Sequence, residues 1–241
     1  FCGSFVYAPL PTRKHIDRYI IIDGQQRFTT LYILIKALAD SATDEADKAA
    51  LEKYLYNEDK FNRYGLDDKS KLKLKPVKTD NDQLQLLMAG KLDKMNKGKD
   101  GIIYHNYMLF RELIATFLAE DPDNSIMMIH DGMDSLICAD IKLDQDDDAQ
   151  EIFERINSTG IKLGLPDLIR NYVLMTDDDQ ERLYEEYWLV MQELLFKDCM
   201  ESFFLDYLNM KMDGFTKESE AYRDFKQIYL NGQYTNESML S

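Results

Sequence analysis

The chain has few of the residues that mark several common protein classes. Only 3 cysteines occur in 241 residues, widely spaced and never as C-x-x-C, which argues against a disulfide framework or a zinc site and favours a reducing compartment. The 3 histidines stand apart, without metal-ligand spacing, and neither a Walker A loop nor a G-x-S-x-G elbow is present. No apolar run approaches the roughly 18 residues that span a bilayer, and no signal peptide is visible. We therefore expect a cytoplasmic protein with no membrane partner.

Proline and glycine are also scarce, with 5 and 11 residues respectively, and this scarcity favours long helices over a strand-rich sandwich. Hydrophobic residues make up 45% of the chain and charged residues 30%, so the chain can bury a core. The apolar, β-rich segments cluster early and the helical periodicities late. We therefore expect a helix-dominated α+β fold with a small mixed sheet and a helical extension.

Two short β-rich runs, residues 3–8 and 18–23, flank a polar loop that contains Pro9 and Pro11, and we expect them to form a strand pair. The run Tyr19–Ile22 has no polar alternation, so its strand is predicted to be buried on both faces. Helical periodicity follows directly after Gly24. Further helices are predicted at 43–56, 80–88, 101–119, 124–136, 166–175, 178–196, 199–212 and 217–230, with a strand at 137–143.

The formal net charge of −15 argues against nonspecific nucleic-acid binding by the whole surface, because an acidic surface repels phosphate. One segment is locally basic. Lys71, Lys73 and Lys75 alternate with leucine, which predicts an edge strand with lysine on its open face. This face is either an ordinary solvated strand or a patch that contacts DNA.

The turn Asp23-Gly24-Gln25-Gln26-Arg27 lies between the apolar strand and the helix. A helix N-terminus offers unpaired N–H groups to an anion, glycine permits close approach, and an arginine fork suits phosphate. Gln25 and Gln26 could donate to phosphate or orient a water, and Asp23 could hold Mg²⁺. The alternative is a turn in which Asp23 caps the helix and Arg27 forms a surface ion pair.

A second polar group follows the predicted strand at 137–143. Asn157, Ser158 and Thr159 end one helix before Gly160, and Asp167 and Asn171 lie four residues apart on the next helix, so they share a face. These residues could line a polar pocket. They could equally be a helix stop signal followed by a favourable acidic first turn.

Together the two segments resemble a known family. Ile22 to Leu31 is similar to the signature DGQQR-x-T-T-L, and Phe153 to Asn171 resembles its downstream partner, F-x-x-x-N-x-x-G-x-x-L-x-x-x-D-L-x-x-N. Both belong to the N-terminal domain of GmrSD-type, modification-dependent restriction enzymes, which is related to the ParB/sulfiredoxin-like fold. The resemblance covers roughly residues 1–175, and residues 176–241 are expected to form the helical extension. The family domain usually begins with a further segment upstream, so 1–175 reads as the domain without that segment.

The resemblance implies a protein of phage defence that binds a nucleoside triphosphate with Mg²⁺ and hydrolyses it. Carried over by position, Asp23, Gln25, Gln26 and Arg27 would be catalytic, with Asp23 also at the metal. Nucleotide-binding residues would be Gly24, Thr29, Thr30, Asn157, Asp167 and Asn171. An HNH-type nuclease domain or subunit is the implied partner, and DNA cleavage is not expected from this chain alone.

Two other functions remain open from the residues. The domain could be a non-catalytic sensor of a nucleotide or of modified DNA, with Lys71, Lys73 and Lys75 on the DNA, that regulates a nuclease. It could also be a helical scaffold in which Asp23 and Arg27 pair with each other. The base, the DNA modification and the oligomeric state are not encoded in any recognisable motif.

Overall fold

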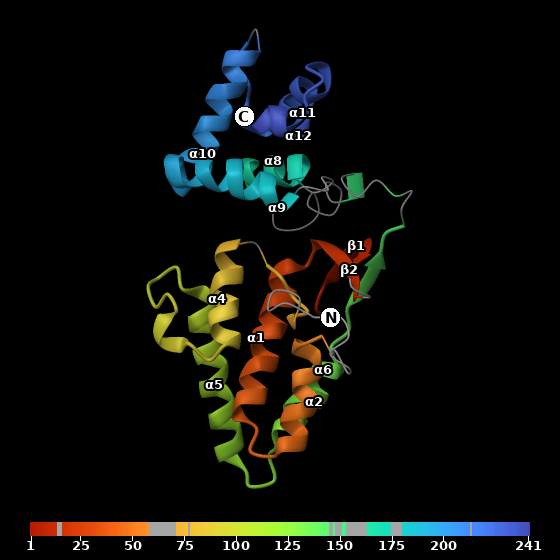
Figure 1. Cartoon of the computed structure of the whole chain (residues 1–241), viewed down its shortest axis with the longest axis vertical. Helices are drawn as coiled ribbons and strands as arrows, with labels where there is room; N and C mark the ends of the chain where they lie inside the picture. Colours follow the sequence, from red (N-terminus) through yellow and green to blue (C-terminus); the bar gives the residue numbers. More distant parts are fainter. Residues whose placement is uncertain are drawn as a thin grey trace. The chain divides into compact units, whose positions relative to one another are not determined.

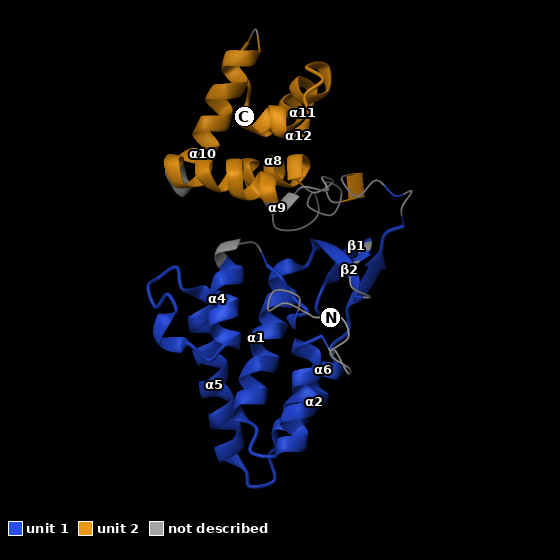
Figure 2. Cartoon of the chain, viewed as in Figure 1, with its two compact units in different colours: residues 1–147 blue, residues 148–241 orange. Residues whose placement is uncertain are grey.

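The computed structural model describes residues 1–13, 16–57, 71–76, 78–144, 147, 151–152, 163–174, 180–212 and 214–241. The chain divides into two compact units, Phe1–Asp147 and Asp148–Ser241 (Figure 2), and each is described by itself. Helices dominate both units, and a small three-stranded mixed sheet lies in the first. The predicted helix-dominated α+β class is confirmed.

The sheet has the order β2-β1-β3. Strand β1 (Ser4–Arg13) pairs antiparallel with β2 (Ile16–Asp23), and Val6 lies opposite Asp23. Its other edge pairs in parallel with β3 (Ala139–Lys142), from Ser4 opposite Ala139 to Tyr7 opposite Lys142. The beginning of β1 is therefore held on both sides, and this is the part that faces the end of β2.

Two expectations for this sheet are wrong. Pro9 and Pro11 lie within β1 and not in a loop; they follow the stretch that pairs with β3, where the strand has a free edge that tolerates a missing N–H. Strand β2 is not buried on both faces, because it lies at the sheet edge. Tyr19 is 47% exposed and only Ile22 of the apolar run is fully buried.

Five helices make up most of the rest of the described part of the first unit: α1 (Gln25–Ser41), α2 (Glu45–Leu55), α4 (Lys78–Met88), α5 (Ile102–Glu120) and α6 (Ile126–Asp134). A short 3₁₀ turn, η1 (Leu92–Lys94), follows α4. Helix α1 packs against α2, α5 and α6, and α4 packs against α5 (Figure 1). The sequence predicted each of these helices to within a few residues, because each buries an apolar stripe in one shared core.

Two buried tyrosines add polar ties to that core. Tyr32 of α1 donates a hydrogen bond to the carbonyl oxygen of Leu55 at the end of α2. Tyr107 of α5 donates to Asp40 Oδ2 of α1 over 2.8 Å. Burial raises the pKa of Tyr32 to about 12, and burial together with the Asp40 carboxylate raises the pKa of Tyr107 to about 12. Both hydroxyls therefore stay protonated donors.

The lysine segment does not form the predicted edge strand. In the described residues 71–76, Leu72 makes a single antiparallel bridge to Tyr56, just after α2. The alternation is nevertheless real, since Lys71, Lys73 and Lys75 are exposed while the two leucines between them are half-buried. Leu74 packs against the core that the helices share.

The second unit is helical in its described part. It contains α8 (Leu165–Leu174), α9 (Gln180–Leu183), a π-helical turn η2 (Tyr184–Trp188), α10 (Leu189–Lys211), a 3₁₀ turn η3 (Glu218–Glu220), α11 (Ala221–Asn231) and α12 (Asn236–Leu240). The predicted break between 196 and 199 is wrong, because α10 runs through it. These helices enclose their own core around Trp188.

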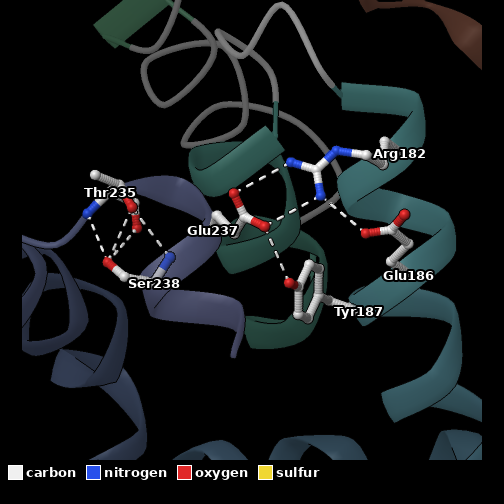
Figure 3. A network of polar contacts seen from close by, with 6 residues as sticks. All are labelled: Arg182, Glu186, Tyr187, Thr235, Glu237 and Ser238. Atoms are coloured by element: carbon white, nitrogen blue, oxygen red, sulfur yellow. Dashed lines mark hydrogen bonds and ion pairs between the residues drawn. The ribbon is translucent and has the colours of Figure 1, made fainter.

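A polar network fixes the last helix of this unit (Figure 3). Arg182 contacts both carboxylate oxygens of Glu237, over 3.1 and 3.2 Å, and Glu186 over 2.8 Å. Tyr187 donates to the same Glu237, and this hydrogen bond raises the tyrosine pKa. The side chain of Thr235 caps α12 at its N-terminus.

The described helices include none that is long and apolar enough to cross a membrane.

Candidate functional site

The candidate site lies where β2 gives way to α1. Gly24 makes the turn with φ 96° and ψ 8°, a left-handed conformation that glycine adopts without strain. The space is also closed to a side chain, since a Cβ at Gly24 would lie 2.7 Å from Cδ1 of Phe5. Glycine at position 24 is therefore required by both backbone conformation and packing.

Asp23 and Arg27 contact each other one helical turn apart. Arg27 Nη2 lies 2.7 Å from Asp23 Oδ2, and Ser4 Oγ donates to the same oxygen over 3.3 Å. The side chain of Arg27 is 39% exposed and that of Asp23 is 26% exposed. The pair is thus accessible to solvent, and Asp23 orients the arginine instead of capping the helix.

The arginine lies in a slot formed by the beginning of β1. Gly3 has φ +91°, and a Cβ there would collide with Nη1 of Arg27. The guanidinium carbon lies 5.6 Å from the centre of the Phe5 ring, which is a favourable cation–π distance. Arg27 Nε is buried and has no hydrogen-bond partner among the described residues.

Gly3, Ser4 and Phe5 were not among the site residues expected from the sequence. The segment 3–8 indicated only a strand. The signal that could have found them is the antiparallel pairing itself, because any strand paired with β2 places residues opposite its last position. In the structure Val6 lies opposite Asp23. The residues just before Val6, Gly3 to Phe5, therefore lie next to the loop.

The remaining loop residues differ in what their side chains contact. Gln25 Nε2 donates to the carbonyl oxygen of Ile21 over 2.9 Å. Thr29 and Thr30 donate back to the carbonyl oxygens of Gln25 and Gln26 over 2.9 and 2.8 Å, a usual arrangement within a helix. Gln26 is exposed.

The N-terminus of α1 carries no side-chain cap and no acidic residue in its first turn. The N–H groups of such a turn are not satisfied within a helix. Together with Arg27 they form a positively polarised corner, and Asp23 is the carboxylate beside it. An arrangement of this kind suits a phosphate oxygen.

The second predicted group is only partly described. Asn157 lies outside the described residues. Asp167 and Asn171 lie on α8 in the second unit, and Asp167 pairs with Arg170 over 3.1 Å. The two units are described separately, so the grouping of these residues with the loop stays a prediction.

No cluster of three or more metal-ligating side chains occurs among the residues that the structure describes. The cysteines are all free. Two hollows in the first unit lie on other elements: one is lined by η1 and α5, the other by α2, Lys73 and α6.

Comparison with curated proteins gives no match to this chain. Comparison with protein families does. Residues 1–174 match the model of the GmrSD restriction endonuclease, N-terminal domain. This match covers the sheet, the Asp23–Arg27 loop and α8, whereas the compact units divide after residue 147; the predicted domain boundary at 175 stays a prediction. The chain belongs to the family of GmrSD restriction endonuclease N-terminal domains, and so to a restriction protein of phage defence.

Proposed function

We propose that this domain binds a nucleoside triphosphate at the Asp23–Arg27 loop. The observation that carries the proposal is the placement of Arg27. Its guanidinium is fixed by Asp23, Phe5 and the absence of a side chain at Gly3. It lies beside a helix N-terminus that no side chain caps.

The polyphosphate would be held by charge and backbone dipoles. The guanidinium has five N–H donors in a rigid fork, so it can contact a phosphate while Nη2 stays on Asp23. The first-turn N–H groups of α1 add donors from the other side. Because the fork and the helix end are fixed before binding, little conformational entropy is lost when the anion arrives.

The oxygen donors at the loop fit the magnesium ion that accompanies a triphosphate. Mg²⁺ usually takes one or two protein carboxylates together with phosphate oxygens and water. Asp23 and the hydroxyl of Ser4, 3.3 Å apart, would hold it. The ion would neutralise phosphate charge next to the carboxylate.

Hydrolysis is the second part of the proposal. Water would attack the γ-phosphorus and the bond from that phosphorus to the β–γ bridging oxygen would break. Nucleoside diphosphate and inorganic phosphate would leave, and the proton of the water would go to solvent. Gln26 is exposed beside the loop, whereas Gln25 is bonded to Ile21. We assign the orienting of water to Gln26 and the support of the turn to Gln25.

The test is direct titration of the protein with each of the four triphosphates and Mg²⁺, together with phosphate release. Arg27→Ala should weaken binding at least about tenfold, because a charge-assisted bidentate contact is lost. Gln26→Ala should keep binding and lose turnover. Arg223→Ala, which removes an exposed arginine paired with Glu220 and Asp224 in the second unit, is the control. If the wild-type protein binds none of the four triphosphates, the proposal fails.

In a restriction protein such a domain would act on a nuclease. The family name supports a nuclease-domain partner and DNA. We infer that the nucleotide state of the loop controls when the nuclease cleaves. Triphosphate addition should therefore change cleavage by the complete protein, and Arg27→Ala should abolish that dependence.

The second candidate is a DNA contact through Lys71, Lys73 and Lys75. The alternating exposure of residues 71–75 favours it. Affinity for duplex DNA should then fall as salt rises. Charge reversal of the three lysines should weaken binding, and equal affinity in the reversed variant would reject this surface.

A further inference from the structure

One hollow of the first unit lies on elements other than the loop. Its volume is about 440 Å³, within the roughly 300–1,000 Å³ range of small-molecule sites. Its walls come from the end of α2, from Lys73 and from α6. The residues that line it are Ala50, Leu51, Lys53, Tyr54, Lys73, Met127 and His130.

The side chains around this hollow combine positive charge with an aromatic ring. Lys53 and Lys73 are exposed, and Lys73 Nζ donates to the carbonyl oxygen of Lys53 over 2.5 Å. This hydrogen bond fixes the Lys73 ammonium at the end of α2. Two lysines lining one hollow on a chain of net charge −15 form a local attraction for an anion.

The aromatic ring is held in place and partly open. Tyr54 is 49% exposed, and its ring centre lies 5.4 Å from that of His130. His130 is largely buried, and its Nδ1 lies 3.5 Å from Asp131 without a hydrogen bond. The imidazole therefore supports one side of the tyrosine and leaves ring surface for a ligand.

We propose that this hollow binds a nucleotide, with the phosphate at Lys53 and Lys73 and the base against Tyr54. Aromatic stacking with a positive groove is the general way that proteins hold unpaired nucleotides. The hollow shares no residue with the Asp23–Arg27 loop, so it is a separate site. The nucleotide is either free or part of a single strand, since both present the same base and phosphate.

The experiment titrates the full chain with adenosine 5′-monophosphate and, separately, with a short single-stranded oligonucleotide. Lys53→Ala and Tyr54→Ala should each weaken binding about fivefold or more. Tyr54→Phe should restore most of the affinity, because the ring remains. Thermal melting checks that each variant is folded.

Two controls separate this site from the loop and from general charge. The double variant Lys91→Ala/Lys94→Ala removes two exposed lysines outside the hollow and should leave binding unchanged. Arg27→Ala tests whether the monophosphate binds at the loop instead: loss of binding in Arg27→Ala with binding kept in Lys53→Ala would place the ligand at the loop and overturn the proposal. Binding of the monophosphate identifies a free nucleotide, and binding of the oligonucleotide alone identifies a strand. Absence of binding to both, or binding that survives Lys53→Ala and Tyr54→Ala, overturns the proposal.

Discussion

Arg27 shows how a surface residue can be positioned without being buried. Asp23 holds one end of the guanidinium, and Phe5 lies 5.6 Å from its carbon. Gly3 contributes only by having no side chain. The exposed ion pair alone would contribute about 0–1 kcal/mol to the stability of the fold. Its role is therefore to fix the position of the guanidinium and not to stabilise the fold.

Gly3→Ala should therefore impair nucleotide binding more than folding. The added Cβ would collide with Nη1 of Arg27 and push the guanidinium from its slot. We expect triphosphate affinity to fall about tenfold, measured by titration. Positive φ at a non-glycine residue adds strain of roughly 1 kcal/mol.

Gly90→Ala is the matched control for that strain. Gly90 also has positive φ, +68°, but nothing lies within 4 Å of an added Cβ. The melting temperature of the Gly90→Ala variant should fall about as much as that of Gly3→Ala. Its affinity for triphosphate should stay at the wild-type level. Equal affinities in the two variants would show that the slot does not matter.

Tyr107 makes stability depend on pH at the alkaline end. Its pKa is raised from 10.0 to about 12 by burial and Asp40, so its contribution is fully present below pH 10 and is lost as pH rises toward 12. Tyr107→Phe should cost about 1–2 kcal/mol at neutral pH through the lost hydrogen bond.

The measurement is denaturant unfolding of both proteins from neutral pH to pH 11. The difference in the free energy of unfolding between the wild type and Tyr107→Phe should narrow as pH rises. Tyr54→Phe, at an exposed tyrosine, should show no such gap. A gap that stays constant or widens with pH would contradict the assignment.

At this scale the sequence predicts the turn better than its surroundings. Gly24 and Arg27 belong to one contiguous segment, and local chemistry indicated their proximity. Gly3 depends on strand pairing, which no local pattern encodes. The motif predicted a catalytic role for Gln25. In the structure its side chain donates to the Ile21 carbonyl, a contact that depends on the turn geometry and that the amino-acid sequence alone does not specify.

Among the elements, α12 depends most on a few polar contacts. It is only five residues long, too short to be stable by itself. Arg182 connects it to η2 through Glu237 and Glu186.

Arg182→Ala should loosen α12 without unfolding the unit. We expect its amides to exchange with solvent about fivefold faster, while those of α10 are unchanged. Hydrogen exchange with mass spectrometry measures both. Lys217→Ala, which removes an exposed cation of this unit, should leave α12 unaffected; similar acceleration there would argue against a specific clamp.

The accuracy of the element predictions follows from what each pattern measures. Helices α1 and α5 were found because their apolar stripes repeat over several turns. Strand β2 was misread because an apolar run does not distinguish a buried strand from an edge strand. The lysine–leucine alternation correctly gave the exposed side, but one bridge to Tyr56 produces the same alternation as a strand.

For the whole molecule, each unit encloses a core of its own. The single tryptophan, Trp188, is buried in the second core. Tryptophan emission therefore reports unfolding of the second unit, whereas far-ultraviolet circular dichroism reports both.

We expect the two signals to give different midpoints in urea, because separate cores commonly unfold separately. Arg182→Ala should move the emission midpoint together with the part of the dichroism curve that belongs to the second unit. Tyr107→Phe should move the rest of the dichroism curve and leave the emission midpoint unchanged. Coincident curves for the wild type and both variants would mean that the units unfold as one.

The pairing of β1 with β3 also bears on the order in which the protein is made. Cys2 N–H donates to the Ile137 carbonyl, and Ala139 N–H to that of Gly3, so a wall of the arginine slot is fixed by residues translated much later. The helices between them can begin to form as they leave the ribosome, since their backbone hydrogen bonds are local. The slot cannot. A partly synthesised chain would carry the complete Asp23–Arg27 motif and still be unable to hold Arg27 in place until the residues of β3 have emerged.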